Sequence, residues 1–169
     1  QVVDRNPYLV YGTTLIVTLF TKGHIICWQL GDGNILFVSE AKTSSMPMGK
    51  DEKMIANETY SMCMKNASQY FNTKVFKDSD PMLRLIVVAS DGYANSFKSE
   101  EGFLKVGTDI LEIIDKEGID VVENELEDWL NETMKSGSGD DITAGIFYRG
   151  NLTSAEKTDK VQTEEIIEN

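Results

Sequence analysis

The sequence predicts an α+β fold, in which packed helices and sheets are combined or stacked as α/β/β/α layers. Short apolar segments rich in β-branched residues alternate with turn residues, which is typical of strands. Two longer segments repeat apolar residues with helical spacing. The expected order is β-β-β-α-β-α-α-β, and this mixture of elements indicates the class.

The first part of the chain predicts three strands joined by tight turns. Residues 13–20 (TTLIVTLF) have no polar face, so we expect a strand that is buried on both sides. Turn signals with glycine follow at residues 21–23 and 31–34. With further strands at residues 24–30 and 35–39, the segment is expected to form an antiparallel meander.

The middle of the chain is less regular until a clear strand appears. Residues 42–53 are polar and rich in methionine, which predicts a loop. Residues 57–71 place apolar side chains at loosely helical spacing, and we expect a helix there. Residues 83–89 (LRLIVVA) form the clearest strand of the sequence, and they run directly into a Ser-Asp-Gly turn.

Two amphipathic helices and a last strand complete the expected domain. The helices cover residues 99–116 and 119–134, because each has one apolar face and Gly118 interrupts the pattern between them. Their outward faces are acidic, as solvated helix surfaces often are. Residues 142–148 predict the last strand, and residues 150–169 form a polar tail without apolar periodicity.

The composition and net charge of the chain argue against several classes of function. The chain has 169 residues, of which 41% are hydrophobic, enough for one domain with a core. Its net charge of -12 repels nucleic-acid phosphates and anionic lipid, and suits divalent cations or basic protein segments. No apolar run reaches membrane length, and no signal peptide is evident. The chain starts at Gln1 rather than methionine, so we expect a processed or trimmed piece.

The cysteines and the histidine indicate a cellular compartment and count against two kinds of site. Cys27 and Cys63 lie among apolar neighbours and are expected as free thiols in a reducing compartment, hence the cytoplasm. His24 is the single histidine, which excludes a histidine-rich metal site and argues against a Ser-His-Asp triad. Its place in a strand favours a structural role.

Three aspartates stand at the ends of predicted strands. Asp32 lies in a Gly-Asp-Gly turn, Asp91 follows the clearest strand, and Asp140 precedes the last one. If these ends converge, the carboxylates share a small volume, and close like charges need cations to neutralise them. An all-oxygen ligand set favours Mg²⁺ or Mn²⁺, and two such ions can clamp a phosphoryl group. The alternative is that each Asp-Gly pair is simply a turn.

Four motifs then follow one another along the chain. They are Tyr11-Gly12-Thr13-Thr14-Leu15, Gly31-Asp32-Gly33, Ser90-Asp91-Gly92 and Gly139-Asp140-Asp141-Ile142-Thr143. In order and spacing they resemble the late motifs of the type 2C metal-dependent serine/threonine protein phosphatases, in a bacterial-like form. The resemblance implies a β-sandwich with helices on both outer faces.

The resemblance also implies chemistry and site residues. Asp91 and Asp140 resemble the family's metal-binding aspartates, and Asp32 resembles the one that holds an additional ion in some members. The implied reaction is hydrolysis of phosphoserine or phosphothreonine in proteins by a metal-activated water, with two or more Mg²⁺ or Mn²⁺ ions in the intact parent. Residues 1–149 would be a partial catalytic domain, and residues 150–169 its tail.

Departures from the family pattern bear on activity. The family's amino-terminal Asp-Gly-His-Gly-Gly segment and its phosphate-binding arginine have no counterpart here, so the chain looks like the carboxy-terminal two-thirds of a phosphatase domain. Asn95 stands where many members are acidic, Asp141 where many have asparagine, and Gly33-Asn34 replace a Ser-Arg pair. Unpaired sheet edges left by a missing segment would favour self-association.

Three interpretations therefore remain open. The first is a metal-dependent protein phosphatase, or a truncated and inactive piece of one. The second is a binding or regulatory module on the same fold that has lost catalysis. The third is a small ligand-binding α+β domain whose Asp-Gly pairs are ordinary turns.

Overall fold

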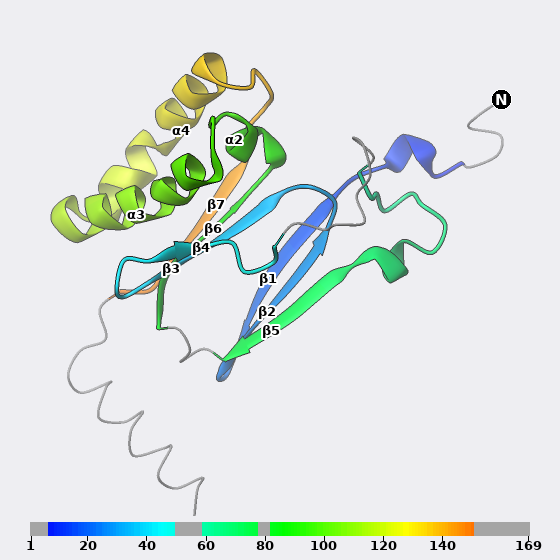
Figure 1. Cartoon of the computed structure of the whole chain (residues 1–169), viewed down its shortest axis with the longest axis horizontal. Coiled ribbons are helices and arrows are strands. Elements are labelled where there is room, and N and C mark those ends of the chain that lie inside the picture. The colour runs from blue at the N-terminus through cyan, green and yellow to red at the C-terminus, as the bar shows by residue number, and fades with distance from the viewer. Residues whose placement is uncertain (1–6, 50–58, 78–81, 151–169) are drawn as a thin grey trace, which may run out of the picture.

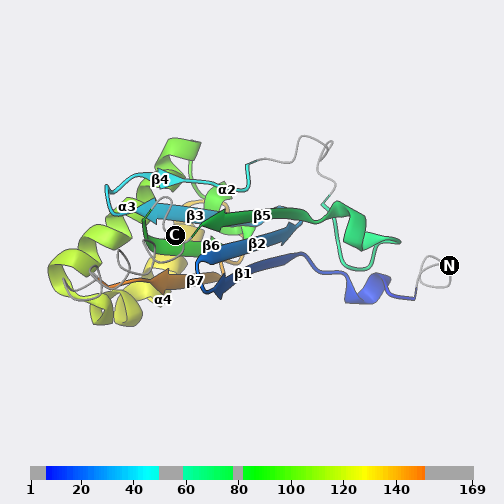
Figure 2. The same ribbon diagram turned by 90° about the horizontal axis from the view of Figure 1, so that it is seen from below.

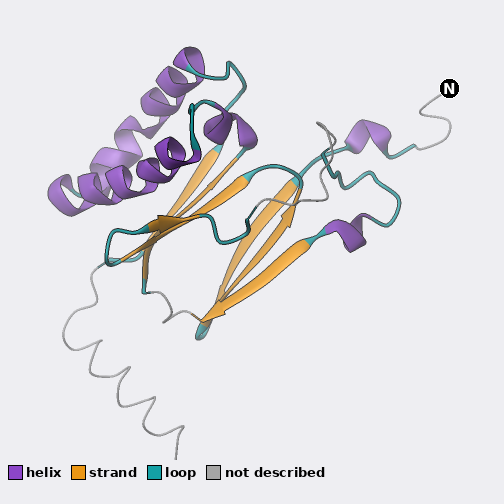
Figure 3. Ribbon diagram, viewed as in Figure 1, coloured by secondary structure: helices purple, strands orange, loops and turns teal. Residues whose placement is uncertain are grey.

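The computed structural model describes residues 7–49, 59–77 and 82–150, which form two antiparallel sheets and a helical layer (Figures 1 and 3). The predicted mixed α+β class is confirmed. The strands are β1 (Leu15–Thr21), β2 (His24–Leu30), β3 (Asn34–Ser39), β4 (Ser44–Ser45), β5 (Asn72–Lys77), β6 (Leu83–Ala89) and β7 (Ala144–Tyr148). The helices are η1 (Leu9–Tyr11), η2 (Ala67–Tyr70), α2 (Asp91–Asn95), α3 (Glu100–Glu117) and α4 (Ile119–Ser136).

The two sheets pack face to face around a shared apolar core. One sheet has the strand order β1-β2-β5 and the other β4-β3-β6-β7. Ile25 and Cys27 of β2 meet Ile35 and Phe37 of β3 in this core. At one side of the sandwich, Phe20 of β1 stacks on Phe147 of β7, although neither strand pairs with the other. Figure 2 shows the sheets from below, with η1 extending away from the helices.

A second core lies between the four-stranded sheet and the helices. Leu36 and Val38 alternate with the inter-sheet residues of β3, so this strand is buried on both faces. They pack with Phe103, Leu111 and Ile114 on the apolar face of α3, and α4 adds Val122. Among the described residues, α3 and α4 cover only this sheet (Figure 1).

The two long helices begin and end where their sequence signals indicate. The Ser99 hydroxyl caps α3 by accepting a hydrogen bond from the Gly102 amide, and two glutamates follow in the first turn. Gly118 separates α3 from α4 with a φ of 97°, a conformation that residues with side chains rarely adopt. Both predicted helices are therefore confirmed, with bounds shifted by one or two residues.

A buried ion pair joins the helical layer to the sheet. Arg84 of β6 is 7% exposed and donates to the Asp115 carboxylate of α3 at 2.8 Å and to the Tyr148 hydroxyl at 3.0 Å. Burial raises the pKa of Asp115, but hydrogen bonds from Lys42 and Arg84 outweigh it and leave this pKa below its usual value. Breaking such a pair strands a buried guanidinium, which is costly.

The expected three-stranded meander is wrong at its third strand. β1 and β2 form the predicted hairpin, with Thr21 paired to His24, but β3 joins the other sheet between β4 and β6. The continuous apolar run of β3 needs cover on both faces, which only the central position provides. β1 takes the edge instead, where Leu19 and Phe20 are 43% and 38% exposed. The prediction that residues 13–20 are buried on both sides is thus also wrong.

The helix expected over residues 57–71 is wrong as well. Its described part is a loop that ends in the short η2, and strand β5 follows directly. The apolar residues there do not build a helix face, because Tyr60 stacks on Tyr70 with ring centroids 4.6 Å apart. Asn66 has a φ of 62°, which breaks any continuing helix.

Other predictions are confirmed or lie outside the described residues. Cys27 and Cys63 are free thiols, and burial raises the pKa of the Cys27 thiol. The strand at residues 83–89 matches β6, whereas the last strand is shorter than expected. The polar tail from residue 151 onward lies outside the described residues. Within the described ranges no helix is long and apolar enough to cross a membrane.

Candidate metal centre and adjoining cleft

The strand registers bring the three candidate aspartates to one end of the four-stranded sheet. Asn34, the first residue of β3, pairs with Ala89, the last residue of β6, and Ala89 also pairs with Ala144, the first of β7. Asp32, Asp91 and Asp140 lie two to four residues beyond these paired positions. These three positions therefore lie at one end of the four-stranded sheet.

The segment that carries Asp91 packs against the segment that carries Asp140. Gly92 packs directly against the segment with Asp140: a methyl group on Gly92 would lie 3.1 Å from Asp140 Cβ and 2.8 Å from the Asp141 carbonyl oxygen. Asp32 does not complete a group of three with them. Within the part of the chain that the structure describes, no three His, Cys, Asp or Glu side chains are arranged to hold a metal ion.

Serine side chains fasten the Asp91 segment to the Asp140 segment. The Ser90 hydroxyl accepts from the Thr143 amide at 3.0 Å, and the Ser90 amide donates to the Thr143 carbonyl at 2.9 Å. The Ser138 hydroxyl donates to the Gly92 carbonyl at 3.1 Å and accepts from the Asp140 amide at 3.2 Å. Three of these bonds join residues 46 to 53 positions apart, and they fix the position of the Asp91 segment relative to the Asp140 segment.

The carboxylate of Asp91 has a neutral hydrogen-bond partner on the same helix. The Asn95 carboxamide donates to Asp91 Oδ2 at 3.3 Å, one helical turn away. An acidic residue at this position would instead repel Asp91 unless a cation lay between them. Asn95 therefore supplies a hydrogen-bond donor to Asp91, at a position where the resemblance implied an acidic residue.

Asp32 is presented by a turn that only glycine permits. Gly31 has a φ of 96°, and a methyl group on Gly33 would lie 2.9 Å from the Ala89 carbonyl oxygen and clash with Ile16. The Gln29 carboxamide also donates to the carbonyl oxygens of Gly31 and Gly33. The conformation and close packing of the two glycines and the hydrogen bonds from Gln29 thus fix the turn that carries Asp32.

Thr59 is a site residue that the sequence analysis missed. Its hydroxyl donates to Asp32 Oδ2 at 2.5 Å, from a position 27 residues away. The incorrect helix prediction for residues 57–71 concealed it, and no local pattern links Thr59 to the Gly-Asp-Gly turn. The signal would have been the run of hydroxyl and aromatic residues around Tyr60, which is unusual for a helix.

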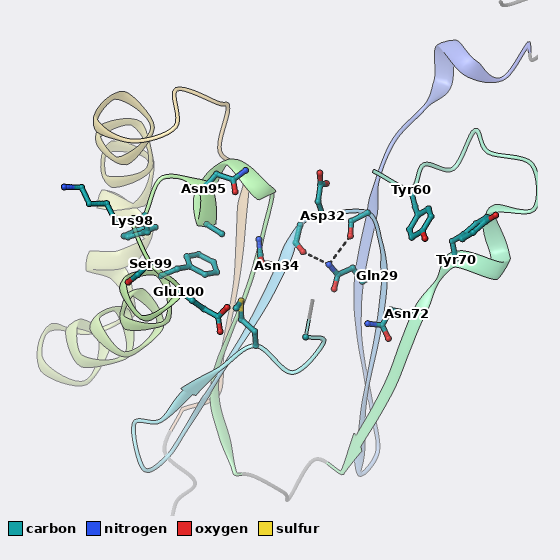
Figure 4. A pocket seen from close by; sticks show the side chains of 17 residues that line it. Gln29, Asp32, Asn34, Tyr60, Tyr70, Asn72, Asn95, Lys98, Ser99 and Glu100 are labelled. Carbon is teal, nitrogen blue, oxygen red and sulfur yellow. Dashed lines mark hydrogen bonds between the residues drawn. The ribbon is translucent and has the colours of Figure 1, made fainter. Parts of the chain in front are cut away.

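A cleft of about 560 Å³ opens beside Asp32, between the two sheets (Figure 4). One wall is the aromatic pair Tyr60 and Tyr70, and the other is apolar, with Phe97 and Phe103. Four carboxamides also line it: Gln29, Asn34, Asn72 and Asn95. Met46 and Gly49 contribute as well, so the described part of the segment predicted as a loop, residues 42–49, borders the cleft. The loop prediction is wrong at Ser44–Ser45, which form strand β4.

The pair Asp91 and Asp140 fits a hard divalent cation by donor chemistry. Both offer carboxylate oxygens, and Gly92 leaves no side chain to separate the two segments. All-oxygen donor sets favour Mg²⁺ and Mn²⁺ over zinc. Two carboxylates are fewer ligands than such ions take, so further ligands would have to come from elsewhere.

Comparisons with solved structures agree with this architecture. The chain superposes on a bacterial serine phosphatase with a TM-score of 0.58 at 16% identity, over 84% of this chain and 60% of the other. It superposes on the catalytic domain of the serine/threonine protein phosphatase PstP, determined in complex with two manganese ions, with a TM-score of 0.51 at 16% identity. That match covers 85% of this chain and 63% of PstP's. The fold is therefore of the type 2C phosphatase kind.

A family comparison identifies the chain directly. The model of protein phosphatase 2C matches residues 2–131, and the chain belongs to that family. It spans only 53% to 63% of the length of the matched phosphatase structures. The comparison with curated proteins finds no match.

Proposed function

We propose that the intact parent of this chain is a metal-dependent protein phosphatase that hydrolyses phosphoserine and phosphothreonine. Membership of the protein phosphatase 2C family supports the general class. The observation that carries the finer proposal is the fastening of the Asp91 segment against the Asp140 segment across Gly92. It supports the proposal because the segments that carry these two aspartates are in contact, and Asn95, on the same helix as Asp91, lines the adjoining cleft.

The residues of this chain would divide the work as follows. Asp91 and Asp140 would bind Mg²⁺ or Mn²⁺, which when bound lowers the pKa of water and neutralises phosphoryl oxygens. Asn95 would hold one oxygen of Asp91 in place, and Ser90 and Ser138 would keep the two aspartates together. Asp32, which accepts a hydrogen bond from Thr59, lines the cleft and would take an additional ion.

The experiment is hydrolysis of p-nitrophenyl phosphate and of phosphopeptides by the intact parent, with and without Mn²⁺. We expect Asp91→Asn to abolish metal-dependent hydrolysis while the protein stays folded. Asp128→Asn, an exposed residue of α4 far from the strand ends, is the matched control and should keep full rate. Full activity of the Asp91 variant would refute the assignment.

A second candidate function is supported by one observation, the neutral Asn95 beside Asp91. On this view the chain is a phosphatase-like binding or regulatory module without catalysis. Titration calorimetry of the chain with Mn²⁺ separates the candidates. Heat that Asp91→Asn eliminates supports a metal site, whereas no heat supports the catalytically inert module.

The exposed edge strand β1 supports a further part of the proposal, self-association. Leu15, Leu19 and Phe20 are all more than a third exposed, and β1 has no second neighbour among the described strands. Such edges pair readily with another chain. Light scattering at high concentration should then give a mass above 18.9 kDa, and a clean monomer would contradict it.

A further inference from the structure

The side chains that line the cleft include several carboxamide and carboxylate oxygens, which accept hydrogen bonds. Three of the four carboxamides use their amino groups within the protein. Gln29 donates to the Gly31 and Gly33 carbonyls, Asn72 to the Met48 carbonyl at 3.1 Å, and Asn95 to Asp91. Gln29 thereby uses both of its N–H donors, whereas Asn72 and Asn95 each use one of two, and all three keep a carbonyl oxygen for a ligand. These oxygens, together with the carboxylates of the lining, accept hydrogen bonds from a ligand that carries donors.

The charged side chains that line the cleft favour a positively charged ligand. Asp32 and Glu100 are the two carboxylates of its lining, and Lys98 is the one cation among the described lining residues. Figure 4 shows the Lys98 side chain directed away from the other labelled residues, whereas Asp32 lies between Asn95 and Tyr60. The net charge of -12 adds a long-range attraction for positive groups.

The aromatic wall completes a site for a basic side chain. Tyr60 and Tyr70 stack with their rings at 21°, opposite the wall formed by Phe97 and Phe103. Ring faces attract guanidinium and ammonium groups, and arginine also stacks on them. A phosphate group, by contrast, finds carboxylates and carbonyl oxygens here, so this cleft does not suit the phosphoryl group itself.

We propose that the cleft is a subsite for an arginine or lysine side chain that flanks the phosphorylated residue of a protein substrate. This inference rests on the proposed function for the phosphorylated partner. Asn95 lines the cleft and also contacts Asp91, so the two sites are adjacent. Because the two sites share Asn95, the basic residue should lie near the phosphoserine in an extended peptide, which advances about 3.3–3.6 Å per residue.

The test is direct binding of matched peptides to the full chain in the presence of a metal chelator, so that Asp32 cannot act through an ion. Fluorescence anisotropy would compare phosphoserine peptides that carry arginine at one flanking position with otherwise identical citrulline peptides, position by position. Citrulline keeps the shape of arginine but has no charge. We expect at least one arginine peptide to bind about tenfold more tightly than its citrulline partner.

Variants locate the effect in the cleft. Glu100→Gln and Asp32→Asn should each reduce the preference for arginine to about threefold or less. Glu123→Gln removes the same charge from an exposed position on α4 and should leave the preference unchanged. Equal binding of arginine and citrulline peptides, no binding of either, or an equal loss in the Glu123 variant would each overturn the proposal.

A further peptide pair separates this subsite from the proposed activity. Unphosphorylated arginine and citrulline peptides should show the same preference, because the cleft recognises the side chain and not the phosphate. If the preference persists while the intact parent hydrolyses no phosphopeptide, the proposed function fails and the basic subsite stands. If hydrolysis occurs without any preference, the subsite fails and the proposed function stands.

Discussion

Thr59 donates a hydrogen bond to the carboxylate of Asp32, and this bond ties the loop before η2 to the Gly-Asp-Gly turn between β2 and β3. The two residues are 27 positions apart in the sequence. Thr59 thereby favours one orientation of the Asp32 carboxylate. Asp32 both lines the cleft and lies beside the start of β3.

Thr59→Val removes this hydrogen bond but keeps the shape of the side chain. Because hydrogen bonds to charged groups are stronger than neutral ones, we expect the free energy of unfolding to fall by about 1–2 kcal/mol. Urea denaturation measures the change. Thr59→Ser retains the hydroxyl and should be close to the parent, and an unaltered midpoint in the valine variant would show that the bond does not stabilise the fold.

Asn95→Asp tests the neutral contact beside Asp91. Without metal, the new carboxylate repels Asp91 at one helical turn, so the thermal midpoint should decrease. With Mn²⁺ the two carboxylates share a cation, so the midpoint should rise more than that of the parent. Thermal denaturation with chelator and with Mn²⁺ gives both values. The same response to Mn²⁺ in both proteins would exclude position 95 from the ion's surroundings.

Asp115→Asn tests the ion pair between α3 and β6. The loss of the carboxylate leaves the buried Arg84 with weaker partners, and we expect a loss of about 2 kcal/mol at neutral pH. Asp109→Asn is the control, because its carboxylate bonds only to the exposed Lys105 within α3 and should matter little.

The same ion pair has a predictable pH dependence. The hydrogen bonds from Lys42 and Arg84 lower the pKa of Asp115 in the folded state, against the effect of burial. Its stabilisation is therefore complete above the unfolded pKa, about 3.9, and disappears as pH falls through the lower folded value. The difference in unfolding free energy between parent and Asp115→Asn should thus shrink only at acid pH.

Tyr93→Phe tests the alkaline limit of the helical core. Tyr93 is 5% exposed beside Phe97 and Phe103, and burial raises its pKa to about 12 from 10.0. A raised folded pKa gives stabilisation that is complete below pH 10 and is lost as pH rises toward 12, roughly 2–3 kcal/mol in total. The phenylalanine variant should lack this loss. Parallel alkaline unfolding curves for the two proteins would contradict the assignment.

The local patterns of the sequence determined most elements of this fold. Amphipathic spacing with a serine cap and a separating glycine specified α3 and α4, and the apolar run of residues 83–89 specified β6. The Ser-Asp-Gly and Gly-Asp-Asp motifs indicated the family and the candidate metal-binding end of the four-stranded sheet. These features depend on residues near one another in the chain, which a single sequence displays.

The partners of each element were decided only by tertiary structure. Residues 13–20 and 35–39 look equally apolar, yet the first is an exposed edge and the second a buried centre, because only one can lie between β4 and β6. Likewise the bond from Thr59 to Asp32 and the cleft that it borders join segments distant in sequence. Such contacts arise from the packing of two sheets against each other, and no periodicity within a single segment encodes them.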